Sequence, residues 1–162
     1  MLKNKETSVT FILWFALLIS SLMYILIDYL IMNKNSNFAS QPIPENYKII
    51  LMIFSFMSLL MGIFSISARK LFVKEKFYTK YFKDVKSAKK IYFITIILSS
   101  ALAETIATFG FILFIMGKNI KIQIAFTFVS IIIMLVNKPS LQEYKNLKKD
   151  IEENENNQEN SF

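Results

Sequence analysis

Long runs of apolar residues alternate with charged segments along most of this chain. The apolar runs cover about residues 8–32, 49–68, 91–117 and 120–136. A helix needs about 20 apolar residues to cross the roughly 30 Å hydrocarbon core of a bilayer. The first three runs reach that length, whereas the fourth is shorter and carries Lys121 and Gln123 near its start. The pattern predicts an all-α integral membrane protein, a four-helix bundle formed by residues 1–137.

The first apolar run does not have the form of a cleaved signal peptide. Residues 8–27 carry no charge over 20 positions, whereas the apolar core of a signal peptide has about 7–15 residues. Asn37, Phe38 and Ala39 make a poor cleavage site, because a small-x-small pattern is required. We expect this run to be a retained helix.

The distribution of basic residues predicts the orientation. With four spans, the N-terminus, the second loop and the C-terminal segment share one side, and they hold fifteen of the 19 Lys and Arg residues. Short basic loops stay on the cytoplasmic side. Both termini are therefore expected in the cytoplasm, with the protein in a bacterial inner (plasma) membrane. This topology accounts for the net charge of +7 without a nucleic-acid partner.

The second loop interleaves basic residues with aromatic and aliphatic ones and contains no Gly or Pro. Its basic residues are Arg69, Lys70, Lys74, Lys76, Lys80, Lys83, Lys86, Lys89 and Lys90. One interpretation is an amphipathic cytoplasmic helix that lies on anionic lipid headgroups or docks an acidic partner. The other is that the flanking helices extend past the membrane and the lysines only enforce topology.

Residues 138–162 form a cytoplasmic segment with two parts. Ser140 and Glu143 have the spacing of a capping box, and apolar residues then recur at helical spacing, which predicts a short helix to about Glu153. The remaining Asn- and Glu-rich sequence has too few apolar residues to order itself. We expect it to be a disordered tail.

The chain contains no Cys and no His. This absence excludes a thiol redox relay, histidine-held haem and a histidine-bound zinc or iron centre. No catalytic pair, metal cluster or nucleophile motif is visible. We therefore expect neither an enzyme nor a protein with a metal or other cofactor.

Glu104 is the strongest candidate for chemistry. It lies thirteen residues from Ile91 and thirteen from Gly117, at the middle of the third run. A carboxylate at that depth is costly, so it should face protein and hold a proton or find a partner. Ser100 and Thr108 lie on its face at i−4 and i+4. These three residues are the predicted proton or cation site.

The surroundings of Glu104 are small and polar. Ser99, Ala103 and Ala107 form a small-xxx-small row on the adjacent face, which lets helices approach closely. Each other helix brings a hydroxyl to the same depth, from Ser20, Ser21, Ser55, Ser58, Thr127 and Ser130. No Lys or Arg lies at that depth. The expected partners are hydroxyls and backbone carbonyls, and the alternative is that Glu104 only joins helices.

Asp28 lies near the outer, non-cytoplasmic end of the first run, close to the membrane interface where Lys121 is expected. An ion pair between these two side chains, or extension of the carboxylate to water, would explain this residue without any activity.

The segment from Ala101 to Gly110, which contains Glu104, Ala107 and Phe109, resembles the carboxylate helix of the ATP-synthase proteolipid, subunit c. The family places its ion-carrying Glu before an Ala, an aromatic residue and a Gly. The second run here has a single glycine, Gly62, and the loop is longer than in the family. The resemblance therefore implies a proton-accepting Glu104 rather than a rotor ring.

Two functions remain open from the sequence. The first is a membrane module that binds a proton or cation at Glu104, as part of a transporter or oligomer. The second is a scaffold that recruits a cytoplasmic partner through its basic loop and tail. The expected partners are the lipid bilayer, anionic headgroups, and a second copy or another membrane protein.

Reporter fusions test the orientation. A cytoplasm-active reporter fused after Phe162 should be active, and a periplasm-active one inserted within residues 33–47 should be active as well, because the basic segments stay inside. A periplasm-active reporter that works after Phe162 would overturn the topology.

Overall fold

The computed structural model describes residues 5–34, 38, 42–70, 85–146, 149 and 153, and the following statements concern these residues. The described part of the chain is helical throughout most of its length and contains no strand. Its main elements are α1 (Lys5–Lys34), α2 (Tyr47–Arg69), α4 (Val85–Gly117) and α5 (Ile120–Val136).

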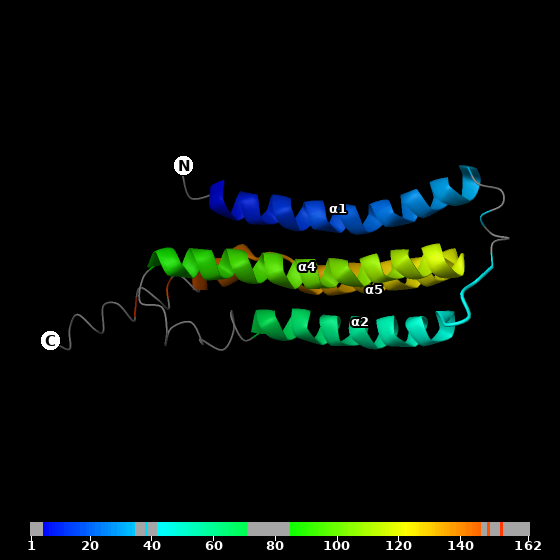
Figure 1. Ribbon diagram of the computed structural model, residues 1–162. Helices are drawn as coiled ribbons and strands as arrows, with labels where there is room; N and C mark the ends of the chain where they lie inside the picture. Colours follow the sequence, from blue (N-terminus) through cyan, green and yellow to red (C-terminus); the bar gives the residue numbers. More distant parts are fainter. Residues whose placement is uncertain are drawn as a thin grey trace.

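The helices lie side by side, with α4 and α5 between α1 on one side and α2 on the other (Figure 1). The start of α1 and the end of α2 lie at one end of the molecule, which we call the Arg69 end. The tight connection between α4 and α5 lies at the other, which we call the hairpin end (Figure 1). α1 and α4 therefore run in the same direction, and α5 runs back.

Three of these helices are long and apolar enough to cross a membrane. They are Val9–Lys34, Tyr47–Arg69 and Tyr92–Gly117. Ile120–Val136 is apolar but shorter, with 17 residues. These helices suggest a membrane protein in contact with a lipid bilayer. Their outward side chains agree, because large apolar residues such as Phe56, Phe64 and Phe128 are more than half exposed.

The small-residue row of α4 forms the centre of the packing, as the sequence predicts. Ser99, Ala103 and Ala107 are fully buried. The hydroxyl of Ser65 on α2 donates to the Ser99 carbonyl at 2.7 Å, and that of Ser130 on α5 donates to the Ala103 carbonyl at 2.6 Å. Small side chains let these hydroxyls reach the α4 backbone, so this face of α4 binds α2 and α5.

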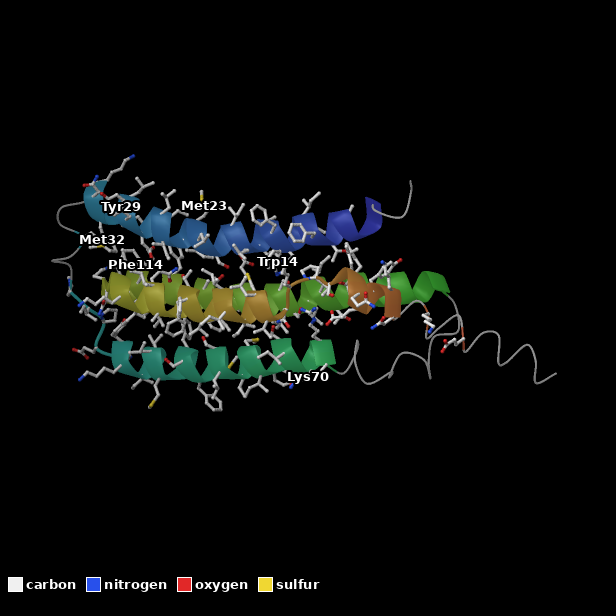
Figure 2. All side chains as sticks on the ribbon, turned by 180° about the vertical axis from the view of Figure 1, so that it is seen from behind. Trp14, Met23, Tyr29, Met32, Lys70 and Phe114 are labelled. Atoms are coloured by element: carbon white, nitrogen blue, oxygen red, sulfur yellow. The ribbon has the colours of Figure 1, made fainter. Side chains whose placement is uncertain are left out.

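α1 is tied to α5 near the Arg69 end. The indole nitrogen of Trp14 donates to the Met134 carbonyl at 3.0 Å, and its side chain is 5% exposed. Figure 2 shows Trp14 projecting from α1 toward the central helices. The indole N–H is thereby satisfied within an apolar surrounding, where an unpaired donor would be costly.

The connection between α4 and α5 is tight. Lys118 has a φ of 56°, and the Asn119 side chain caps α5 by accepting the Lys121 N–H at 3.1 Å. The ring of Tyr47 packs against Gly117 and occupies the space that a Cβ at this position would take. The short loop makes α4 and α5 a close antiparallel pair, in agreement with the predicted hairpin.

Arg69 binds the end of α5 and the segment that follows it through hydrogen bonds. Its guanidinium donates to the Val136 carbonyl at 3.2 Å, the Lys138 carbonyl at 2.6 Å and the Glu143 carboxylate at 2.6 Å. Residues 141–146 are helical, within the helix predicted there. The Tyr92 hydroxyl donates to the Ser140 carbonyl at 2.9 Å. The predicted tail beyond Glu153 lies outside the described residues.

At Gly110 the backbone of α4 lies close against the side chains of α5. A Cβ there would lie 2.5 Å from Oε1 of Gln123 and 2.6 Å from Cβ of Phe126. Gly110→Ala should therefore lower the stability of the protein by about 1–3 kcal/mol through overpacking, despite the better helix propensity of Ala. Thermal unfolding in detergent measures this change.

Gly62→Ala is the matched control, since a Cβ at Gly62 would meet only the terminal Cδ1 atoms of Ile133, at 3.0 Å, and Ile106, at 3.9 Å. It should lower the unfolding temperature much less than Gly110→Ala. Equal destabilisation by the two variants would contradict this account of the α4–α5 contact.

Candidate functional site

The carboxyl group of Glu104 lies between α4 and α1 at half the length of the bundle. The hydroxyl of Ser20 donates to its Oε1 at 2.8 Å, and the hydroxyl of Tyr24 donates to the same oxygen at 3.2 Å. Thr108 extends the group, because its hydroxyl lies 3.2 Å from the Tyr24 oxygen and 3.3 Å from the Glu104 carbonyl. We call Ser20, Tyr24, Glu104 and Thr108 the carboxyl cluster.

Helical spacing brings this cluster together. Ser20 and Tyr24 are four residues apart on α1, and Glu104 and Thr108 are four residues apart on α4, so each pair lies on one helix face. The Tyr24 ring also stacks on Phe111 with centroids 5.4 Å apart. α4 uses its small-residue row to bind α2 and α5, which leaves the neighbouring face with Glu104 directed at α1.

The cluster contains no positive charge. The ion pairs among the described residues are Arg69–Glu143 and Lys149–Glu153, and Glu104 belongs to neither. Both hydrogen bonds of its side chain end on Oε1, so Oε2 has no partner in the part of the chain that the structure describes. An ionised carboxylate without a counter-charge is costly in an apolar layer. Glu104 itself is only half-buried, and its contacts in the described part of the chain are with hydroxyl groups of α1.

Ser100 does not join the cluster. It is fully buried, and its hydroxyl donates to the Ile96 carbonyl of its own helix at 2.7 Å. Tyr24 takes part instead, and the sequence analysis did not single it out. Its position four residues after Ser20 was the available signal, since both residues fall on one face of α1.

Asp28 is fully buried, and neither of its carboxylate oxygens has a hydrogen-bond partner. The expected ion pair with Lys121 is therefore absent, and Asp28 does not extend to solvent. Lys121 is exposed on the first turn of α5. The sequence placed Asp28 near the end of its span, but it did not reveal that α1 turns this carboxylate into the protein.

The basic loop has only a few members with described side chains. Arg69 is 8% exposed and bound at the Arg69 end, so it is a structural residue of α2 rather than a surface one. Lys70 and Lys90 are exposed. The side chains of the other loop lysines lie outside the described residues: Lys74, Lys76, Lys80, Lys83, Lys86 and Lys89.

In the described ranges, no three Asp, Glu, His or Cys side chains come together in a way that would hold a metal ion. Comparison of the chain with known proteins adds no further assignment: no family model, curated protein or solved structure matches it. The functional argument therefore rests first on the geometry of the carboxyl cluster.

Tyr24→Phe tests the cluster. The variant keeps the stack on Phe111 but removes the hydroxyl that joins Glu104 to Thr108. It should lower the stability by about 1 kcal/mol, the usual net contribution of a hydrogen bond, as measured by unfolding with a denaturing detergent in mixed micelles. Tyr29→Phe is the control on the same helix, because Tyr29 is 61% exposed and should change nothing. Equal effects of the two variants would argue against the cluster.

Proposed function

We propose that this protein is a multi-pass membrane protein that crosses the bilayer four times, with both termini in the cytoplasm, and that Glu104 reversibly binds a proton. The protein would act as part of a proton-coupled transporter or of an oligomer in a bacterial inner membrane. We propose that the protein is not an enzyme and that its helices are surrounded by lipid.

The observation that supports this function is the polar setting of one carboxyl group at mid-length of an apolar helix pair. Oε1 of Glu104 accepts two hydroxyl protons, whereas Oε2 is free of described partners. An ionisable residue within a membrane span is often part of a proton or ion pathway. The resemblance of residues 101–110 to the proteolipid helix supports the same role for Glu104.

A proton suits the cluster better than a metal cation. Ca²⁺ takes 6–8 oxygen ligands and Mg²⁺ a full octahedron, usually with more than one carboxylate or several waters. The cluster offers one carboxylate and three hydroxyls. A neutral carboxylic acid, in contrast, needs only a hydrogen-bonded pocket and no counter-charge.

The alternative function is a scaffold in which Glu104 only joins α1 to α4. The hydrogen bond from Ser20 is compatible with that role, since polar side chains join membrane helices. In this case the exposed Lys70 and Lys90, with the rest of the basic loop, would recruit an acidic partner or anionic headgroups.

Proton flux separates the two functions. The wild-type protein in lipid vesicles should acidify or alkalinise the lumen when a pH gradient is imposed, and Glu104→Gln should slow this flux by roughly a hundredfold. Gln keeps the shape and accepts the same hydroxyls, so the fold should persist. Glu104→Lys should disrupt the packing, because it places an ammonium against Ser20 and Tyr24.

Glu45→Gln is the matched control, because Glu45 is exposed and lies outside the helices. Its flux should equal that of the wild type. If Glu104→Gln also retains wild-type flux, or if added sodium rather than pH governs the flux, the proton-binding function is wrong and the scaffold or a cation site replaces it.

A further inference from the structure

Among the carboxylates that the structure describes, Asp28 is buried in a position that the proposed function leaves unexplained. The residue is fully buried, and both carboxylate oxygens lack a partner. Burial of an ionised and unpaired carboxylate is among the least favourable arrangements in a protein. A proton on one oxygen removes that charge. The environment of Asp28 is thus suited to the neutral acid.

The position of Asp28 relates it to the carboxyl cluster. Ser20, Tyr24 and Asp28 follow one another at intervals of four residues on α1, so they share one helix face. With a rise of about 1.5 Å per residue, Asp28 lies about 12 Å from Ser20 along the axis, toward the hairpin end. The Tyr24 hydroxyl binds Oε1 of Glu104 and receives a hydrogen bond from Thr108, and in sequence Tyr24 lies one helix turn from Asp28.

We propose that Asp28 is a second proton-binding carboxyl and that it exchanges protons with Glu104 through the hydroxyls of Thr108 and Tyr24. This inference rests on the proposed function of Glu104. It adds a direction for proton movement, because Asp28 lies on the side of the carboxyl cluster that is nearer the hairpin end.

The charged groups near the hairpin end do not neutralise Asp28. Lys118 donates to the Ile115 carbonyl at 2.6 Å and lies 4.3 Å from the ring centre of Phe38. Lys121 on α5 and Lys34 on α1 are exposed. The Tyr47 hydroxyl on α2 is buried without a hydrogen bond. No ion pair of the described residues involves Asp28, and this supports neutralisation by a proton.

The transfer conserves atoms and charge. The carboxylic proton of Asp28 moves to the Thr108 hydroxyl oxygen, the Thr108 proton moves to the Tyr24 oxygen, and the Tyr24 proton moves to Oε1 of Glu104. Neutral Asp28 and ionised Glu104 become ionised Asp28 and neutral Glu104. Neither Asp28 oxygen has a hydrogen-bond partner in the structure, so the proposed step from Asp28 to the cluster requires a bridging water molecule.

Infrared titration of the purified protein in lipid tests the site independently of flux. A protonated carboxyl gives a carbonyl stretch that shifts on exchange into heavy water. Asp28→Asn should remove the Asp28 band and leave the Glu104 band. Glu104→Gln should remove the Glu104 band and leave the Asp28 band. Asp28→Glu should move the Asp28 band, which keeps the test decisive if Asp28→Asn does not fold. Glu45→Gln should leave both bands in place.

Flux in vesicles tests the path. Asp28→Asn should slow proton flux by roughly tenfold, and Asp28→Glu should restore most of it. A spectrum unchanged by both Asp28 variants would overturn the site, and loss of the band with wild-type flux would overturn the path. Wild-type flux in Glu104→Gln would instead reject the function of Glu104, while the Asp28 band would still report on the second site.

Discussion

The structure depends on one constraint: the carboxyl group of Glu104, at mid-length of α4, requires hydrogen-bond donors on the helix that packs against it. Glu104 meets this requirement with hydroxyls from α1, which fixes the face of α4 that α1 contacts. The adjacent face of α4 carries small residues and binds α2 and α5 through their hydroxyls. The polar requirement and the small-residue row together decide the order of the helices around α4.

The same physical rule explains the contacts at the Arg69 end. Within apolar surroundings, a donor gains stability when it meets an acceptor, and at this end the acceptors are mostly backbone carbonyls. Trp14 uses that of Met134, and Arg69 uses those of Val136 and Lys138 together with the Glu143 carboxylate. These bonds close the end of the bundle.

The sequence predicted the helical class, the three long apolar helices and the buried small-residue row, because these depend on length, hydropathy and spacing alone. It also identified Glu104 and Thr108. It assigned Ser100, Arg69 and the Asp28–Lys121 pair differently from the structure, because each depends on how neighbouring helices rotate about their axes. That rotation brings Tyr24 to Glu104 and turns Asp28 inward, and apolar periodicity is weak in helices that are apolar on nearly every side.

The most direct test of the central claim is covalent labelling of Glu104 by a hydrophobic carbodiimide, followed by mass spectrometry of the modified peptide. Carbodiimides react with protonated acids in the membrane interior, so a proton-binding Glu104 should be labelled at low pH and progressively less as the pH rises. Glu104→Gln should abolish labelling of the peptide. Absence of labelling at every pH, or labelling that does not change with pH, would contradict a reversible proton site and leave Glu104 as a structural contact between α1 and α4.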